Sequence, residues 1–256
     1  MVTELKISYY LKTVPYGRPL WCEVWEATSV LLGRGGGPHG CVSNRCCGLP
    51  GLSAGDLEAA LSLARQNIIE LEKNPRAVVV VDDSSCAATV KDYPSLFKWA
   101  PDWRARAEAL AVRTKDLSEW IAEKAVLPLL PSRVVIAYHD PCKARYAQGI
   151  VDPPRQILRK CPGVELREIP EAEQCCGGGG TYSFLHPEIS RQILARKAAH
   201  IDSTGAEIVL TSSVSCLLQL KFGLRRAKSK VKAMHLAEFL AGEKSITLAC
   251  PPKSGP

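Results

Sequence analysis

Three absences narrow the function of this 256-residue chain before any motif is considered. No two of its cysteines have the C-x-x-C spacing, which excludes ferredoxin-type ligand runs, zinc ribbons and thioredoxin-like redox pairs. No apolar run approaches the roughly 18 residues of a membrane span, and Met1–Leu20 contains no apolar core of a signal peptide. We therefore expect a cytoplasmic protein without a transmembrane segment, whose thiols are reduced and free to bind metal.

Other common functional signatures are missing as well. The sequence has no Ser/His/Asp arrangement, no paired-carboxylate site and no phosphate-binding glycine loop followed by lysine, so we expect no catalytic residues of these kinds. The net charge of +7 is modest, and no nucleic-acid-binding motif lies near the densest basic stretch, Lys221–Lys232. That stretch is typical of a solvated helix end, or of a docking site for an acidic partner or an anionic membrane surface.

Cysteine, in contrast, is present in excess. The chain has 11 cysteines within an ordinary globular composition of 46% apolar and 23% charged residues. Small secreted domains use many cysteines for disulfides because their cores are small, but a chain of this length can bury a substantial core. Three cysteines follow no pattern and are expected to be ordinary thiols: Cys22, Cys161 and Cys250.

An internal repeat organises most of the others. The run Cys46-Cys47-Gly48 recurs 129 residues later as Cys175-Cys176-Gly177. Each run is followed by a helical pattern, then by an apolar β-branched stretch, and then by a single cysteine, Cys86 or Cys216. The spacing from doublet to single cysteine is 39 residues in one copy and 40 in the other. This match predicts two copies of one structural unit.

Short buried strands alternate with helices in both copies, so we expect an α/β fold of two repeated parallel-sheet units with helices packed on the sheets. The units should span residues 1–128 and 129–256, joined near the proline-containing stretch 127–132. In the second unit Cys142, the doublet and Cys216 each follow a predicted strand. Because the carboxyl ends of parallel strands meet at one edge of a sheet, the topology predicts a metal site at that edge.

Four converging thiolates suit either a tetrahedral zinc ion or an iron–sulfur cluster. The glycine run after the second doublet favours the cluster, because the N–H groups of Gly177 and Gly178 can approach and stabilise a bulky anionic core. Cys216 is expected to begin a helix, whose dipole favours the thiolate. His139, three residues before Cys142, either supports the cluster by hydrogen bonding or is satisfied by the backbone.

The motifs of the second unit resemble those of the cysteine-rich CCG domain. They include HDPC at 139–142, CCGGGG at 175–180 and SCLLQL at 215–220. The first unit is similar from CCGLPGLSAGD at 46–56 to SSCAATVKDYP at 85–94, so the resemblance covers about 200 of the 256 residues. This domain occurs in the iron–sulfur subunits of glycolate oxidase and lactate-utilisation proteins, and in the catalytic subunit of heterodisulfide reductase.

The resemblance implies an iron–sulfur electron-transfer subunit of a 2-hydroxy-acid oxidoreductase, closest to the glycolate oxidase subunit, rather than a stand-alone catalyst. It implies a [4Fe-4S] cluster, a flavin-containing partner subunit that oxidises glycolate or lactate, and a downstream electron acceptor. It also allows peripheral association with the inner face of the membrane. The ligands in the second unit would be Cys142, Cys175, Cys176 and Cys216.

Two alternatives remain open. The family's fullest motif ends in C-x-x-C, but Asp83 and Ser213 stand where its first cysteine would be. This departure weakens one alternative, a heterodisulfide reductase-like subunit that carries out thiol–disulfide chemistry on its cluster. The other alternative is a zinc-stabilised binding module, which would be redox-silent.

The first unit departs further from the family pattern. A further cysteine is expected near positions 6–14 but is absent, and Met1–Asn44 does not resemble the family's opening strand and turn. We therefore expect a unit that is incomplete or divergent at its start, with Asp83 or Cys41 as candidate fourth ligands. Its candidate metal ligands are Cys46, Cys47 and Cys86.

Overall fold

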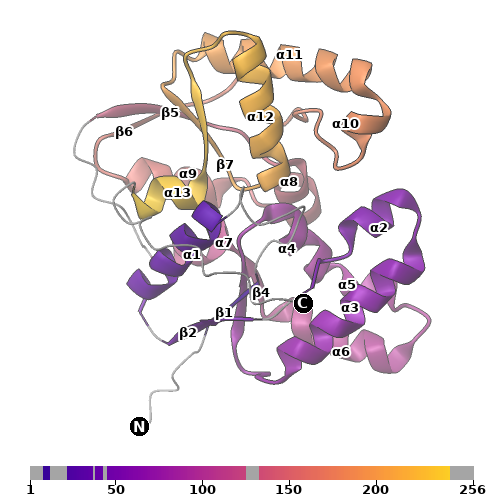
Figure 1. The fold of residues 1–256 in the computed structure, drawn as a ribbon. Coiled ribbons are helices and arrows are strands. Elements are labelled where there is room, and N and C mark those ends of the chain that lie inside the picture. Colours follow the sequence, from indigo (N-terminus) through magenta and orange to yellow (C-terminus); the bar gives the residue numbers. More distant parts are fainter. Residues whose placement is uncertain (1–7, 12–21, 37, 43–44, 125–132, 243–256) are drawn as a thin grey trace.

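Two parallel β-sheets form the framework of the chain, of which the computed structural model describes residues 8–11, 22–36, 38–42, 45–124 and 133–242 (Figure 1). Both sheets have four strands with the same order, β2-β1-β3-β4 and β6-β5-β7-β8. The first contains β1 (Ser8–Leu11), β2 (His39–Cys41), β3 (Val78–Val81) and β4 (Thr114–Asp116). The second contains β5 (Val134–Tyr138), β6 (Val164–Arg167), β7 (Ile208–Thr211) and β8 (Lys232–His235). The repeated order and parallel pairing confirm the α/β class.

Helices connect the strands in each unit. Those before the second sheet are α1 (Cys22–Arg34), α2 (Leu49–Ala54), α3 (Leu57–Glu72), α4 (Ser84–Lys91), α5 (Tyr93–Leu96), α6 (Pro101–Val112) and α7 (Leu117–Lys124). Those of the second unit are α8 (Cys142–Gln148), α9 (Asp152–Lys160), α10 (Tyr182–Leu185), α11 (Pro187–Ser203), α12 (Val214–Arg226) and α13 (Leu236–Ala241). Among the described helices, none combines the length and the apolar character that crossing a membrane requires.

Local sequence accounts for many of these elements. β3 consists of four valines, whose branched side chains favour the pleated sheet. α3 begins after Asp56, whose carboxylate accepts a hydrogen bond from the N–H of Ala59 at 2.9 Å. α9 carries Pro153 and Pro154 in its first turn, where the missing backbone N–H groups would have had no partner within the helix.

The first sheet contains an opening strand that the sequence did not reveal. β1 lies between β2 and β3, as β5 lies between β6 and β7, with Tyr10 opposite Val80 in the register. This strand is only four residues long, and no cysteine motif follows it as HDPC follows β5. The predicted division between residues 128 and 129 lies outside the described residues and stays a prediction.

One hydrophobic core is shared by the two units. Helices α1 and α7 of the first unit pack against α13 and α9 of the second, between the two sheets (Figure 1). The buried side chains of this core include Leu31, Trp120, Ile157 and Leu240. Two further cores lie within single units, one beneath α3, α4 and α6 and one beneath α11 and α12. Burial of apolar surface therefore holds the units together as well as stabilising each one.

A polar seam joins the units where β3 and β7 end; we define the seam as residues 83–85 and 212–214. Ser84 donates its N–H to the carbonyl of Ser212 at 2.9 Å, and the two hydroxyls lie 2.8 Å apart. The hydroxyls of Ser85 and Ser213 lie 3.2 Å apart. Because these contacts are buried or partly buried, they fix the relative position of the helices that begin here, α4 and α12.

The Asp83 carboxylate caps both of these helices. Its Oδ1 accepts from the N–H groups of Ser85 at 2.8 Å and Cys86 at 3.0 Å, in the first turn of α4. Its Oδ2 accepts from the N–H of Val214 at 2.6 Å and from the Ser213 hydroxyl at 3.1 Å, at the start of α12. Burial raises the pKa of this carboxyl, and the N–H donors of both helices oppose the rise. One side chain thereby satisfies donors of two helix N-termini.

We predict that Asp83→Asn destabilises the apoprotein by roughly 2–4 kcal/mol, because the amide NH₂ group would face backbone donors that now meet an oxygen. Urea unfolding measures this loss. Asp56→Asn is the matched control, since it changes an exposed cap of one helix and should cost only a few tenths of a kcal/mol. Equal losses in the two variants would contradict the role of Asp83 at the seam.

A second prediction concerns His235, which is buried and whose Nδ1 accepts from the N–H of Ala237 at 3.2 Å. Burial lowers the pKa of His235 from 6.5 to about 4. Between these pH values the imidazole binds a proton in the unfolded chain but not in the folded one. The contribution of His235 to the free energy of unfolding is therefore complete above pH 6.5 and is lost as the pH falls from 6.5 to about 4. His235→Asn should remove up to about 3 kcal/mol of this pH dependence in urea unfolding. The exposed His186→Asn should retain it; an unchanged profile in His235→Asn would refute the assignment.

Candidate metal centre

Four cysteines of the second unit gather at the carboxyl edge of its sheet. Cys142 is the first residue of α8, shortly after β5 ends. Cys175 and Cys176 lie in the loop between β6 and α10, and Cys216 is in the first turn of α12. The structure therefore brings together all four side chains that the sequence predicts as ligands in this unit; we call them the quartet.

The quartet thiols form a continuous series of contacts. Among the thiols, Cys142 donates to Cys175, and Cys176 donates to both Cys175 and Cys216. The pKa of Cys175 is lowered because it accepts from Cys142, and the pKa of Cys216 is lowered because it accepts from Cys176 and lies beside His139. The donors Cys142 and Cys176 have raised pKa values. Four thiols in contact at one sheet edge can supply thiolate ligands to a metal.

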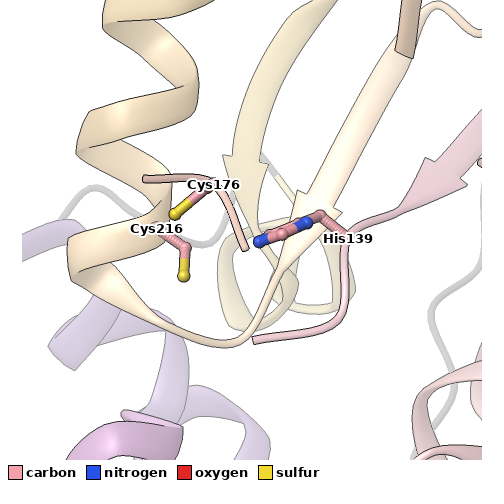
Figure 2. A group of neighbouring side chains, drawn as sticks. All are labelled: His139, Cys176 and Cys216. Carbon is pink, nitrogen blue, oxygen red and sulfur yellow. The ribbon is translucent and has the colours of Figure 1, made fainter. Parts of the chain in front are cut away.

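The imidazole of His139 points toward Cys176 and Cys216, the two buried cysteines of the quartet (Figure 2). A ring nitrogen of His139 and the sulfurs of Cys176 and Cys216 all lie within 4.8 Å of one another. The histidine is fully buried, yet neither ring nitrogen has a hydrogen bond of acceptable geometry within the described part of the chain. A buried polar ring without such a partner is costly, so this orientation fits a group bound among the sulfurs.

The glycine run shapes the other side of the site. Gly177 donates its N–H to the sulfur of Cys175 at 3.2 Å, and its backbone has a φ of +81°. A Cβ on Gly177 would lie 2.7 Å from the carbonyl oxygen of Ser190, whose hydroxyl donates to the Gly177 carbonyl at 2.8 Å. A Cβ on Gly178 would lie 3.4 Å from the sulfur of Cys176. The close backbone approach therefore leaves no room for a side chain at Gly177, whereas a Cβ at Gly178 would only be in ordinary contact with its neighbours.

A buried ion pair holds the loop that carries His139 and Cys142. Arg155 of α9 donates to both carboxylate oxygens of Asp140, at 2.8 and 3.1 Å, and also to Glu168. Hydrogen bonds to Asp140 and Glu168 raise the pKa of Arg155 against the effect of burial. This bidentate pairing fixes the plane of the Asp140 carboxylate and hence the backbone between the histidine and the cysteine.

Among its described side chains, the first unit brings together three thiols, Cys46, Cys47 and Cys86, which we call the trio. Hydrogen bonds link Cys46 to Cys47 and Cys47 to Cys86. Hydrogen bonding to Cys47 and burial raise the pKa of Cys46. Both oxygens of Asp83, proposed above as a fourth ligand, already accept from helix donors at the seam. Cys41 is exposed, and its thiol contacts the carbonyl of Val42 at 3.6 Å.

A polar pair supports the backbone of the first doublet. Asn67 of α3 donates to the carbonyl of Cys46 at 3.0 Å and to the hydroxyl of Tyr93 at 3.1 Å. Tyr93 in turn donates to the carbonyl of Cys47 at 3.0 Å. Both supporting side chains are buried. The doublet is therefore held rigidly even though the first unit offers fewer thiols than the second.

A family model described as "Cysteine-rich domain", CCG, matches residues 38–91 and 136–221, which together exceed half of the chain. The chain belongs to the CCG family. Each matched segment contains one doublet and the single cysteine that follows it. The family assignment made from the sequence motifs is thus confirmed.

Relatives of this CCG protein have names that refer to hydroxy acids. Lactate utilization protein A of Oceanobacillus iheyensis is 33% identical over 197 residues, covering 76% of this chain and 80% of that protein. A protein of Bacillus subtilis named probable glycolate oxidase iron-sulfur subunit is 34% identical over 208 residues, covering 78% of this chain and 47% of that protein. YkgE of Escherichia coli is 35% identical over 199 residues, covering 76% and 82% respectively.

A solved structure supports the fold of this CCG protein. A hypothetical protein from Helicobacter pylori superimposes with a TM-score of 0.63 at 13% sequence identity. The match covers 94% of this chain and 52% of that chain. Because the identity is low, the similarity extends to the arrangement of strands and helices alone.

Several supporting residues of the CCG site could not be predicted from the motifs. Nothing in the sequence distinguishes Asn67 or Arg155 from other polar helix residues. For His139 the sequence left open a ring satisfied by the backbone, which the described residues do not provide. Cys161 is buried in the shared core and contacts the carbonyl of Ile157, away from both thiol groups. Cys250 lies outside the described residues, as does the side chain of Cys22.

We predict that Gly177→Ala destabilises the second CCG unit by roughly 2–4 kcal/mol, because its Cβ would overlap the Ser190 carbonyl and its positive φ disfavours alanine. Gly180→Ala is the matched control, since it has a φ of +61° but its Cβ would meet nothing within 4 Å. Urea unfolding of both variants separates the overlap from the backbone strain. Equal destabilisation would show that close packing at Gly177 is unimportant.

Proposed function

We propose that this chain is an iron–sulfur electron-transfer subunit of a 2-hydroxy-acid oxidoreductase. The observation that carries the proposal is the contact among four thiols at one sheet edge, beside a buried histidine ring that has no well-formed hydrogen bond among the described residues. The names of the lactate utilization and glycolate oxidase relatives support the substrate class. By the same analogy, a flavin-containing subunit would oxidise the hydroxy acid and pass electrons to this chain.

The donor set fits a [4Fe-4S] cluster, with Cys142, Cys175, Cys176 and Cys216 as its ligands. Bound there, the cluster would supply a centre that gains and loses single electrons. The surrounding residues suit such a group in two ways. The N–H of Gly177 already points at a ligand sulfur, and His139 offers a ring N–H from the buried side. Donors directed at sulfur stabilise an anionic cluster and raise its potential.

Zinc at the same four thiolates is the principal alternative for the metal. A structural zinc ion is satisfied by four tetrahedral sulfurs and has no use for a fifth polar group. The quartet instead has His139 within 4.8 Å of two of its sulfurs, with no other partner of suitable geometry among the described residues. A polar ring in addition to the four thiolates favours an iron–sulfur cluster, which is larger than a zinc ion.

Burial of the ligands suggests the direction of electron entry. Cys176 and Cys216 are 2% and 6% exposed, whereas Cys142 and Cys175 are intermediate. Partial exposure of two ligands leaves one edge of the site near the surface, where an electron donor or acceptor can approach. The buried ligands and His139 keep the opposite side dry, which limits hydrolysis of a cluster.

Thiol–disulfide chemistry of the heterodisulfide reductase type is less well supported. The positions at which the fullest family motif has its additional cysteine are Asp83 and Ser213. Both side chains are hydrogen-bonded to each other within the seam at 3.1 Å. The space that the extra cysteine would use is therefore occupied by contacts that join the two units.

The proposal predicts that anaerobically purified protein is coloured and contains about four iron and four sulfide per quartet. Cys175→Ser should abolish the visible absorption and the bound sulfide, because it removes the thiolate that contacts two others. Cys161→Ser is the matched control, since Cys161 lies outside both thiol groups and should leave the absorption unchanged. Metal and sulfide analysis with a visible spectrum measures all three proteins.

The same measurements separate the alternatives. Stoichiometric zinc without labile sulfide would refute electron transfer and leave a binding module. Colour that survives Cys175→Ser would show that the quartet is not the site. We also propose the trio as ligands of a second metal ion. Cys46→Ser should then lower the metal content while leaving the quartet's spectrum unchanged, and an unchanged metal content would make the trio purely structural.

A further inference from the structure

The exposed apolar side chains of the second unit are unevenly distributed. All of the large ones among its described residues lie on α8, α10, α11 and α12; α8 and α12 carry quartet cysteines in their first turns, and α10 and α11 follow the doublet. The most exposed are Phe184 and Leu185, at 84% and 71%. The others are Tyr146, Tyr182, Ile189, Leu218 and Phe222. Exposed apolar groups that gather in one place indicate a surface that contacts something other than water.

Five of these side chains belong to neighbouring elements; we call Phe184, Leu185, Ile189, Leu218 and Phe222 the apolar face. α10 is followed directly by α11, which packs against α12. Gln219, next to Leu218, donates to the hydroxyl of Ser190, next to Ile189, at 3.0 Å. Figure 1 shows α10, α11 and α12 together at one side of the second sheet.

A basic segment continues from this face. Residues 221–232 follow the sequence KFGLRRAKSKVK, which contains no acidic residue. Its six basic side chains are all exposed, and none forms an ion pair within the described part of the chain. Arg225 and Arg226 lie one helical turn beyond Phe222, so charge and apolar surface adjoin along α12.

We propose that the apolar face and the basic segment together dock on an anionic lipid bilayer. The decisive feature is the excess of positive charge: the segment carries six basic side chains and no acidic one, and Asp202, which accepts from Ser229, is an acidic neighbour from outside it. A protein partner commonly presents a polar rim of mixed sign, whereas an anionic leaflet attracts a cluster of about four to eight basic residues. Aromatic and aliphatic side chains at the tip of α10 can then enter the boundary between headgroups and acyl chains.

This docking would place the quartet next to the lipid. The loop of Cys175 and Cys176 leads through the glycine run into α10, and a Cβ on Gly178 would lie 3.6 Å from Gln219 of α12. The apolar face is thus built on the same backbone that holds two quartet thiols. A lipid-soluble electron acceptor could then approach the cluster, a consequence that rests on the function proposed above.

The test is co-sedimentation of the full-length apoprotein with vesicles of phosphatidylcholine, with and without phosphatidylglycerol as about one lipid in three. We expect binding to the anionic vesicles that weakens as salt is raised, and no binding to the neutral ones. Arg225→Ser with Arg226→Ser should weaken binding roughly 30-fold. Phe184→Ser with Leu185→Ser should weaken it about tenfold, because two apolar side chains no longer insert.

The matched control is Trp99→Ser with Val112→Ser, two side chains of the first unit that are each 87% exposed. This variant should bind as the wild type does. The proposal would be overturned if the protein did not bind anionic vesicles. It would also be overturned if the Arg225/Arg226 and Phe184/Leu185 variants bound as well as the Trp99/Val112 control. Sedimentation equilibrium adds a further outcome, since a dimer that dissociates on replacing Phe184 and Leu185 would mean that a second copy covers the face. Cys175→Ser should still bind vesicles, so loss of the cluster and loss of docking are measured separately.

Discussion

The carboxylate of Asp83 is the contact on which the arrangement of both thiol sites depends. It accepts from the first turn of α4, which carries Cys86, and from the start of α12, which carries Cys216. Neither helix could shift or rotate without leaving a buried N–H unsatisfied, a penalty comparable with a large part of a domain's stability. The shared core of α1, α7, α9 and α13 adds the apolar part of the same constraint. The two CCG units therefore behave as one body around a polar seam, although the sequence describes them as a repeat.

The seam also accounts for the difference between the two sites. A cysteine at position 83 or 213 would serve a metal, but the aspartate and serine there serve the junction between the units. In the first unit the cysteine that follows β1 is Cys22, whose side chain lies outside the described part of the chain, so the described trio has three sulfurs. In the second unit Cys142 follows β5 and completes the quartet. The two described ligand sets therefore differ, although Asn67 and Tyr93 hold the first doublet firmly in place.

Much of this could be predicted because it depends on order along the chain. Cysteines that follow parallel strands must meet at one sheet edge, so the quartet was predictable from spacing and topology alone. Contacts between distant segments left no such signal. The caps that Asp83 provides join residues about 130 positions apart, and the sequence suggested a metal ligand there instead. β1 could not be predicted from the sequence, because a strand of four residues has too few positions to show a periodic pattern. The hydrogen bonding of the His139 ring could not be predicted for a related reason. Only the tertiary structure shows that no described backbone group forms a hydrogen bond with either ring nitrogen.

The distribution of polarity around the quartet follows from these constraints. Because α12 is held at the seam, Cys216 and His139 are buried, whereas Cys142 at the start of α8 and Cys175 before α10 are partly exposed. The glycine run contributes no side chains, so the first large groups beyond it are those of α10: Tyr182, Phe184 and Leu185. Apolar side chains beside a partly exposed site can exclude water when a partner covers them. Under the proposed function, the partly exposed ligands Cys142 and Cys175 would then mark the side at which electrons enter or leave, and the buried ligands the protected side.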